Sequence, residues 1–290
     1  MKILVTGANG QVGRELVELG LQQGDDIIAA DRSQLDISCQ QSVSDFCRRH
    51  QPHAIINAAA FTAVDLAEAE PEKAFAVNAQ GVKHLANVAC ELNIPILHIS
   101  TDYVFDGQAE RPYNEQDTPS PINIYGQSKL QGEVYLHNSG ARYLILRTSW
   151  VFGRYGNNFV KTMLRLASER DELSVIDDQI GCPTAAVDIA KALLVALSAL
   201  LNNPALVGTY HYAGRSAVSW FELASAAITL AQEKNIISNK PELKAILSEQ
   251  YPVAAIRPVN SRLDSSKFKR VFGMSGSDWQ LALQTIVSGA

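Results

Sequence analysis

The chain has 290 residues, of which 47% are hydrophobic and 19% are charged, as expected of a globular protein with a substantial core. A chain of this length forms one large domain or a core domain with a smaller lobe. Its formal net charge of −5 argues against a surface that binds nucleic acid or an anionic membrane.

The beginning of the chain and its apolar stretches predict a cytoplasmic protein with no membrane span. Residues 1–7 lead directly into a strand and a glycine loop, which leaves no room for the apolar core of a signal peptide. The longest apolar stretch, residues 192–201, is too short to cross a bilayer. The 4 cysteines form no CxxC pair, so we expect free thiols rather than a disulfide or a zinc site.

The first half of the chain alternates short β-branched runs with helical stretches. Strands are predicted at residues 2–5, 26–30, 54–57, 94–100 and 143–148. Helices are predicted between them, at residues 11–22, 40–50, 72–92 and 124–137. This alternation indicates an α/β fold, a doubly wound parallel sheet of Rossmann type with helices on both faces.

After residue 150 the regular alternation of strands and helices ends, because loops become longer and prolines more frequent. Helices are predicted at about residues 157–168, 186–201 and 219–234. We predict that residues 1–150 form the main domain and that the helix at 186–201 returns to it. Residues 151–185 and 202–290 are then expected to form a smaller, C-terminal, substrate-binding lobe.

The loop after the first strand carries the spacing GxxGxxG. Gly7 permits a sharp turn, Gly10 lets the backbone approach a pyrophosphate, and Gly13 lets helix and strand pack closely. The helix begins at Gln11 and Val12, so its free N–H groups face the phosphate charge. A plain tight turn is the alternative, but the strand before the loop and the helix after it are the context of a dinucleotide site. The spacing resembles that of the short-chain dehydrogenase/reductase superfamily.

Two residues at the end of the second strand leave the choice between NADH and NADPH open. The Asp31 carboxylate can accept hydrogen bonds from the adenosine ribose, which favours NADH, unless it is a solvated loop residue. Arg32 can instead pair with a 2′-phosphate. Asp36 and Ile37 resemble the stretch that lies over the adenine in this superfamily.

Small residues follow the third strand. Ala58, Ala59 and Ala60 let the backbone come close to a flat ligand at the carboxyl end of the sheet, where open sheets bind ligands. We therefore expect these three residues to contact the cofactor.

Tyr125 and Lys129 are four residues apart on a predicted helix, so they share a face and can point into one pocket. A phenol titrates near ~10 in water, and a nearby ammonium and the nicotinamide charge would lower that pKa toward neutrality. Lys129 could also hold ribose hydroxyls, or the two residues could be a surface pair. Thr101 ends the fourth strand, where its hydroxyl could bind a substrate oxygen and orient Tyr125 or could bond local backbone.

Longer stretches extend this comparison to one family. The chain resembles the dTDP-4-dehydrorhamnose reductases at residues 100–107, 125–133, 147–153, 178–184 and 257–264. The resemblance runs from the first strand to near the C-terminus, and the last three stretches are more specific than the glycine loop. It implies reduction of the 4-keto group of dTDP-4-dehydro-L-rhamnose to dTDP-L-rhamnose by NADPH or NADH.

The resemblance also implies roles for single residues. Thr101, Tyr125 and Lys129 would be catalytic, and Thr62 would lie beside the nicotinamide. Thr101 and Asp102 would contact the nucleotide sugar.

Trp150 and Arg257 complete the substrate site that the resemblance implies. The residues themselves agree with this role, because the Trp150 indole offers a flat face for a sugar or base and Arg257 has the fork geometry for phosphate. The alternatives are that Trp150 is part of the core and that Arg257, beside Pro258, marks a turn.

We predict no required metal. Some relatives bind a divalent ion at a subunit interface through an acid near Glu15, but this chain has few carboxylates around Asp188. The acidic residues Asp65, Glu68 and Glu70 are more typical of a solvated helix start. A homodimer is compatible with the resemblance.

Other functions compete with this one. A 4,6-dehydratase needs Asp-Glu directly after the threonine, whereas Asp102 is followed by Tyr103. Another nucleotide-sugar 4-reductase or a 4-epimerase uses the same tyrosine and lysine and stays open. A non-catalytic, cofactor-binding regulatory subunit also stays open, since fold alone does not exclude it.

Overall fold

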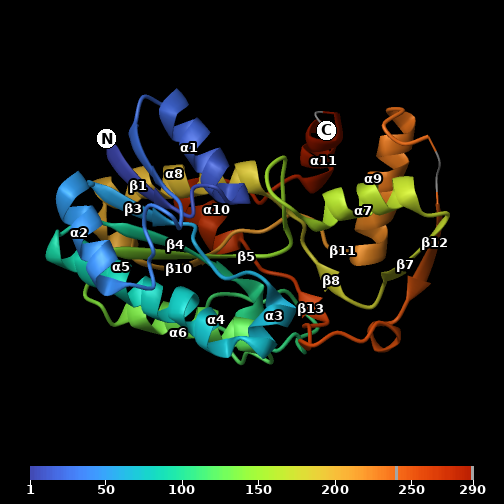
Figure 1. The fold of residues 1–290 in the computed structure, drawn as a ribbon, viewed down its shortest axis with the longest axis horizontal. Helices are drawn as coiled ribbons and strands as arrows, with labels where there is room; N and C mark the ends of the chain where they lie inside the picture. The colour runs from blue at the N-terminus through green and yellow to red at the C-terminus, as the bar shows by residue number, and fades with distance from the viewer. Residues whose placement is uncertain (239–240, 289–290) are drawn as a thin grey trace.

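A six-stranded parallel sheet forms the centre of the computed structural model, which describes residues 1–238 and 241–288 (Figure 1). Its strands are β1 (Lys2–Thr6), β2 (Asp26–Ala30), β3 (Ala54–Asn57), β4 (Ile96–Thr101), β5 (Tyr143–Thr148) and β10 (Gly208–His211). They lie in the order β10-β5-β4-β3-β1-β2. The chain moves outward from β1 to β2 and then crosses to β3. The crevice at the carboxyl ends of β1 and β3 is therefore where such a sheet binds ligands.

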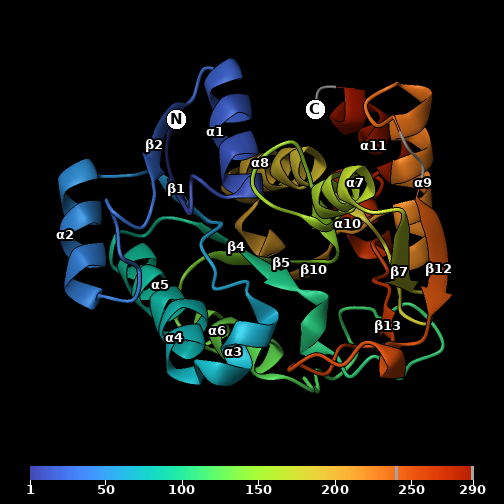
Figure 2. The ribbon, with the colours of Figure 1, turned by 45° about the vertical axis from the view of Figure 1, so that its right-hand side comes forward.

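Helices cover both faces of this sheet, which confirms the predicted architecture (Figure 2). One face carries α1 (Gln11–Gln22), α8 (Ala186–Asn202) and α10 (Ser266–Phe272), and the other carries α2 (Gln40–His50), α5 (Gly81–Glu91) and α6 (Ile124–His137). Successive strand residues serve opposite faces: Ile55 packs in the α2–α5 cluster and Ile56 in the α1–α8 cluster. Because both faces are buried, the strands contain runs of apolar residues, such as Ile55 and Ile56, instead of an alternation of apolar and polar ones.

The predicted helix at residues 72–92 is interrupted in the structure. It consists of α4 (Pro71–Phe75), a π-helical turn η1 (Ala76–Gln80) and then α5. Within the turn, the Asn78 side chain accepts a hydrogen bond from the backbone N–H of Phe61 and donates one to its carbonyl. The wider turn thus places a buried amide against the loop after β3, a use typical of π-bulges.

A smaller part of the molecule lies beside the sheet and has its own core. Its helices are α7 (Phe159–Glu169), α9 (Trp220–Glu233) and α11 (Trp279–Ser288). Its short strands pair as β7 (Glu172–Ile176) with β12 (Glu242–Ile246), β6 (Val151–Phe152) with β9 (Thr184–Ala185), and β8 (Ile180–Gly181) with both β11 (Val218–Ser219) and β13 (Asn260–Ser261). No helix in the described part of the chain is long and apolar enough to cross a membrane.

The boundary of this smaller part differs from the predicted one at two segments. The sequence assigns residues 202–290 to it, yet β10 pairs in parallel with β5, and α10 packs on the main sheet. The reason is burial, because Tyr210 and Phe268 belong to the same core cluster as Ile189 of α8. The division of the chain into two domains otherwise stays a prediction.

A buried ion pair joins α6 to the sheet. Arg147 of β5 donates from Nη2 to Glu133 Oε2 at 2.6 Å and from Nε to Oε1 at 2.9 Å. Ser100 of β4 also donates to Glu133 Oε1, at 2.5 Å. The Arg147 and Glu133 side chains are only 6% and 5% exposed, so each charge depends on the other. This pair fixes α6 over β4 and β5.

We expect Glu133→Ala to destabilise the fold by about 3–5 kcal/mol, because it leaves the Arg147 guanidinium buried without its carboxylate. Urea unfolding at neutral pH measures this change. Glu169→Ala, which breaks an exposed pair with Arg165 in α7, is the matched control and should cost less than about 1 kcal/mol. Equal losses in the two variants would contradict the anchoring role of the buried pair.

Candidate active site

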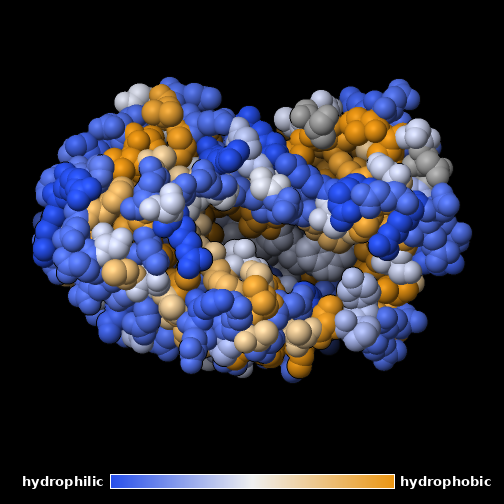
Figure 3. All heavy atoms as spheres, viewed as in Figure 1, coloured by the Kyte–Doolittle hydropathy of each residue, from blue (hydrophilic) through white to orange (hydrophobic). Residues whose placement is uncertain are grey.

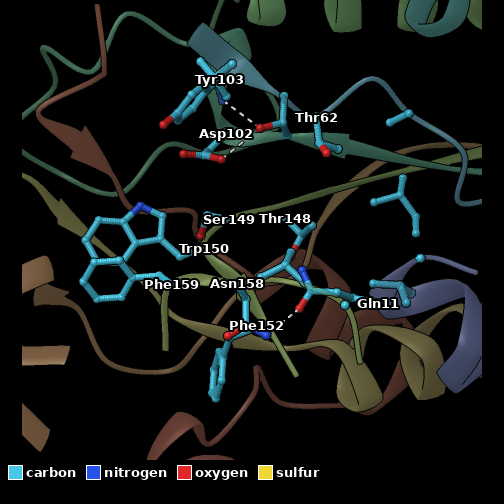
Figure 4. A pocket seen from close by; sticks show the side chains of 18 of the residues that line it. Gln11, Thr62, Asp102, Tyr103, Thr148, Ser149, Trp150, Phe152, Asn158 and Phe159 are labelled. Atoms are coloured by element: carbon cyan, nitrogen blue, oxygen red, sulfur yellow. Dashed lines mark hydrogen bonds between the residues drawn. The ribbon is translucent and has the colours of Figure 1, made fainter. Parts of the chain in front are cut away.

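A cavity of about 660 Å³ lies between the main sheet and the smaller part of the molecule. The space-filling view shows the surface hollowed between these two parts (Figure 3). The start of α1, the ends of β4 and β5 and the first turns of α6, α7 and α9 all contribute to its walls. Figure 4 shows Gln11 of α1, Thr148 of β5 and Phe159 of α7 among the lining residues. Segments far apart in the sequence therefore meet at the edge of the sheet where the topology predicts a ligand.

The glycine loop forms one end of the cavity. Gly7 has φ +65°, and a Cβ there would lie 2.6 Å from the Ala59 backbone nitrogen, so only glycine fits. Gly10, Gln11 and Val12 line the cavity. Gly13 packs behind the loop, where a Cβ would be 2.2 Å from the Gly7 carbonyl oxygen. The predicted loop geometry is thus present, with the N-terminus of α1 directed at the cavity.

The small residues after β3 form the adjoining wall. Ala58, Ala60 and Thr62 line the cavity, while the backbone of Ala59 faces Gly7. The Ala59 N–H donates to Asn57 Oδ1 at 3.1 Å. This bond holds the loop after β3 close to the glycine loop.

The residues expected near the adenosine lie at the end of β2, outside the cavity walls. Asp31 Oδ2 accepts a hydrogen bond from Asn9 Nδ2 at 2.6 Å, and its Oδ1 accepts from Ser33, chiefly the hydroxyl, which lowers the pKa of this carboxyl. Arg32, which follows Asp31, is exposed. The Asp31 carboxylate is therefore held in place next to the glycine loop.

Asp36 and Ile37 have different surroundings. The Asp36 carboxylate accepts from the Ser38 hydroxyl at 2.6 Å and from the Ser38 N–H at 3.0 Å, which lowers its pKa. Ile37 is buried in the core cluster beneath α2 and α5. The Ile37 side chain therefore supports the loop from the core.

Helix α6 brings Tyr125 to the cavity. It begins at a capping residue, Asn123, whose side chain accepts from the Gly126 N–H at 2.8 Å. Desolvation raises the pKa of the Tyr125 phenol, and the Asp102 charge adds to this effect, while the nearby Thr101 side chain opposes it. The expected lowering of this pKa by Lys129 is not found, because loss of hydration outweighs other influences. Tyr125 is therefore a protonated phenol at neutral pH.

Lys129 lies on the same face of α6 and also lines the cavity, although its side chain is almost fully buried. It is 1% exposed, and its Nζ donates to the Ile99 carbonyl oxygen at 2.7 Å and lies 3.2 Å from His98 Nε2. Burial lowers the pKa of Lys129 to about 8, although Glu133 opposes the shift. Sequence analysis did not identify His98, since one histidine within an apolar strand carries no recognisable pattern.

Thr101 and Asp102 lie at the end of β4, where the chain turns into the 3₁₀ helix η2 (Asp102–Val104). Thr101 Oγ1 donates to Asp102 Oδ1 at 3.0 Å and accepts from the Tyr103 N–H at 3.2 Å (Figure 4). Asp102 is 4% exposed, and its Oδ2 has no partner at hydrogen-bond distance and angle among the described residues, while the nearby Ser261 hydroxyl only partly offsets the effect of burial on its pKa. Burial raises the pKa of Asp102 to about 6. An unpaired buried oxygen at a cavity wall suits a polar ligand.

Trp150 forms an aromatic wall together with a residue that sequence analysis missed. Trp150 has φ +48°, and its ring stacks on Trp220 with centroids 3.4 Å apart and planes at 7°. Gly181 passes beneath it, where a Cβ would come within 2.2 Å of the indole. Trp220 Nε1 donates to Gln179 Oε1 at 3.2 Å. Both indoles line the cavity, so Trp150 is not simply part of the core.

Arg257 does not extend into the cavity. Its guanidinium meets Asp65 of α3 (Val64–Ala69), a short helix absent from the predicted elements, with Nη2 2.6 Å from Oδ2 and Nη1 3.1 Å from Oδ1. The pair lowers the pKa of Asp65, and the Ala255 N–H donates to the same carboxylate at 3.1 Å. The fork expected to bind phosphate thus holds the segment before β13 against the main domain.

A second ion pair holds the segment between β6 and α7 over the glycine loop. Arg154 donates from Nε and Nη2 to Glu15 of α1, each at 3.0 Å, and Asn158 Nδ2 donates to Gln11 Oε1 at 3.0 Å. Glu15 is 2% exposed. Its carboxylate therefore has a guanidinium partner, and the described residues contain no group of three or more metal-binding side chains.

Comparisons with known sequences identify one family. Residues 1–290 match the profile of the family described as "RmlD substrate binding domain". The chain is 46% identical to the dTDP-4-dehydrorhamnose reductase of Aggregatibacter actinomycetemcomitans, over 98% of each chain. It is 41% identical to the dTDP-4-dehydrorhamnose reductase of Escherichia coli strain K12, over 99% of this chain and 97% of that one.

Solved structures of the same family are also similar to this chain. The dTDP-4-dehydrorhamnose reductase of Bacillus anthracis in complex with NADP has a TM-score of 0.91 and 37% identity, and the match covers 100% of this chain and 99% of that one. The UDP-glucose 4-epimerase of Thermus thermophilus in complex with NAD has a TM-score of 0.84 at 20% identity, covering 99% and 98% of the two chains. The second likeness shows the fold alone.

The buried carboxyl of Asp102 predicts a pH dependence of stability. Because its pKa is raised in the folded protein to about 6 from 3.8, its favourable contribution is present below about pH 4 and is lost as the pH rises through about 6. We therefore expect Asp102→Asn to gain stability relative to the wild type by about 2–3 kcal/mol between acidic and neutral pH. Urea unfolding of both proteins at several pH values measures the difference. A constant difference from pH 4 to pH 8 would contradict the raised pKa.

Proposed function

Since the chain belongs to the dTDP-4-dehydrorhamnose reductase family, we propose that it reduces the 4-keto group of dTDP-4-dehydro-L-rhamnose to dTDP-L-rhamnose, using NADPH or NADH. The observation that carries the proposal is a single cavity with a dinucleotide-type glycine loop at one end, Tyr125 and Thr101 in its wall and a tryptophan pair beside them. A full-length match to reductases accompanies this arrangement. Location in the cytoplasm and assembly as a homodimer stay predictions.

The cofactor would lie along the carboxyl ends of β1, β2 and β3. The cradle fits a dinucleotide, because a Cβ at Gly7 would collide with the Ala59 backbone and the free N–H groups at Gln11 and Val12 face the cavity. Gly10 and Gly13 would keep the loop narrow. When bound, the nicotinamide supplies the hydride.

The remaining cofactor contacts would come from side chains on both sides of this cradle. They are Asp31 and Arg32 at the adenosine end, Asp36 and Ile37 near the adenine, Ala58, Ala59, Ala60 and Thr62 along the nicotinamide half, and Tyr125 and Lys129 at the ribose. The Asp36 side chain bonds Ser38 and the Ile37 side chain fills the core, so an adenine contact there would come mainly from the backbone of this stretch.

Tyr125 would supply the proton in the reduction. A phenol kept protonated by burial can donate to the alkoxide that forms when the carbonyl carbon accepts hydride. Thr101 would hydrogen-bond the same oxygen and orient it toward Tyr125. The third catalytic residue, Lys129, lies one turn after Tyr125 on α6. It would bind the ribose hydroxyls and affect the pKa of the Tyr125 phenol.

The nucleotide sugar would occupy the end of the cavity that faces the smaller part of the molecule. Trp150 and Trp220 offer a flat apolar surface for a base or sugar ring, and the free oxygen of Asp102 suits a sugar hydroxyl. Arg257 stays a candidate for the diphosphate only if its guanidinium can leave or share Asp65. The substrate site thus draws on both parts of the chain.

We expect Tyr125→Phe to lower the rate of reduction about 10²–10⁴-fold while leaving cofactor affinity nearly unchanged, because the general acid is removed without loss of the ring. Oxidation of NADPH in the presence of dTDP-4-dehydro-L-rhamnose measures the rate, and fluorescence titration measures binding. Tyr135→Phe, on the same helix with its hydroxyl bonded to Gln80, is the matched control. A Tyr125→Phe rate within a few-fold of the wild type would remove Tyr125 from the proposed mechanism.

We expect Trp220→Ala to raise KM for the nucleotide sugar about 5–20-fold, because Trp150 loses its stacking partner and the flat wall with it. Cofactor affinity without sugar should not change. Phe221→Ala, the next residue of α9 but outside this cavity, should leave KM near the wild-type value. The proposed substrate site is wrong if cofactor and sugar affinities fall equally in Trp220→Ala.

A further inference from the structure

A line of buried polar side chains runs through the sheet behind the cavity. Thr6, Asn57 and His98 lie at paired positions on three neighbouring strands, β1, β3 and β4, and Lys129 of α6 follows them. All four residues are at most 1% exposed. The bonds along the line are 2.6 Å from Thr6 Oγ1 to Asn57 Oδ1, 3.0 Å from Asn57 Nδ2 to His98 Nδ1, and 3.2 Å from His98 Nε2 to Lys129 Nζ.

The backbone sets the direction of these hydrogen bonds. Asn57 Oδ1 faces the N–H of Ala59 at 3.1 Å, and a backbone N–H can only donate. The amide of Asn57 is therefore oriented with its oxygen toward Ala59 and its NH₂ toward His98. His98 Nδ1 must then accept. In a neutral imidazole the other nitrogen carries the proton, so Nε2–H of His98 points at Lys129.

Lys129 can satisfy this contact in only one protonation state. An ammonium has three donors and no acceptor, so it would oppose the Nε2–H of His98 donor to donor. A neutral amine accepts from Nε2–H through its lone pair while it donates to the Ile99 carbonyl oxygen. We propose that His98, held as the Nε2–H tautomer by Asn57, is a positioning residue that favours the neutral amine form of Lys129 in the free protein.

Other ionisable groups near Lys129 do not reverse the preference for its neutral amine form. Glu133, one turn further along α6, favours the ammonium, but its carboxylate is already shared with Arg147. Tyr125, one turn earlier, is a neutral phenol, and Asp102 approaches from β4 with a raised pKa. Burial lowers the pKa of Lys129 to about 8 and that of His98 well below its usual value, in the direction that the hydrogen bonds require.

The tautomer of His98 also affects catalysis, and this effect rests on the proposed function. The neutral amine form of Lys129 does not stabilise the Tyr125 phenolate, so a shift toward that form favours the protonated phenol that donates during reduction. The state of His98 and Lys129 in the free protein does not depend on that proposal.

NMR of the free protein tests the inference without turnover. The probes are ¹⁵N-labelled histidine and ¹³C-labelled lysine, with His98→Gln and Lys129→Arg used to assign the two signals. We expect His98 to show the Nε2–H tautomer across neutral pH and Lys129 to titrate near pH 8, well below the surface lysines. An Nδ1–H tautomer, or a Lys129 that titrates with the surface lysines, would overturn the proposal.

Asn57→Asp should produce the opposite tautomer of His98. A carboxylate has no N–H to offer, so it should draw the proton to Nδ1, free Nε2 to accept from an ammonium and raise the pKa of Lys129 by about 1–3 units. Thr6→Val is the matched control, since Ala59 still orients the Asn57 amide and the tautomer should not change. If the Asn57→Asp protein folds and the tautomer of His98 is unchanged, the proposal is wrong. If the variant does not fold, the spectra of the wild type alone test the proposal. Absence of reductase activity alongside the expected spectra would count against the proposed function alone.

Discussion

The site depends on how firmly α6 is attached to the sheet. An apolar contact alone would allow the helix to slide or rotate, whereas the Glu133–Arg147 pair, joined by Ser100, satisfies its charges in only one position. Tyr125 lies two turns and Lys129 one turn before Glu133 on this helix, so the placement of the helix determines how far each reaches toward β4. The geometry of the proton donor is therefore set by a buried charge pair that does not itself line the cavity.

Ion pairs also set the shape of the cavity, because irregular segments form its outer walls. Arg154 fastens the segment before α7 to Glu15 of α1, and Arg257 fastens the segment before β13 to Asp65 of α3. Neither segment has regular structure to hold it in place, and each is joined to a helix of the main domain. A cavity between two parts of a chain can keep a defined shape in this way while it stays open to a large ligand.

The electrostatics inside the cavity favour neutral groups. Burial raises the pKa values of Asp102 and Tyr125 and lowers that of Lys129, so each shift reduces the charge of its group. In such surroundings the direction of single hydrogen bonds decides which atoms carry protons. The Asn57–His98–Lys129 line is one instance, and the Thr101 hydroxyl, which donates to Asp102 and accepts from Tyr103, is another.

The sequence by itself determined the sheet, most of its helices, the glycine loop and the spacing of Tyr125 and Lys129, because these follow from local periodicity and from turns that few residues can make. It did not reveal the π-helical turn at residues 76–80, or that residues 208–211 join the main sheet. Only the tertiary structure paired Trp150 with Trp220, Arg257 with Asp65, and His98 with Lys129. Each of these contacts joins side chains that are distant in the chain. Their partners are selected by packing and burial, which leave no regular spacing in the sequence.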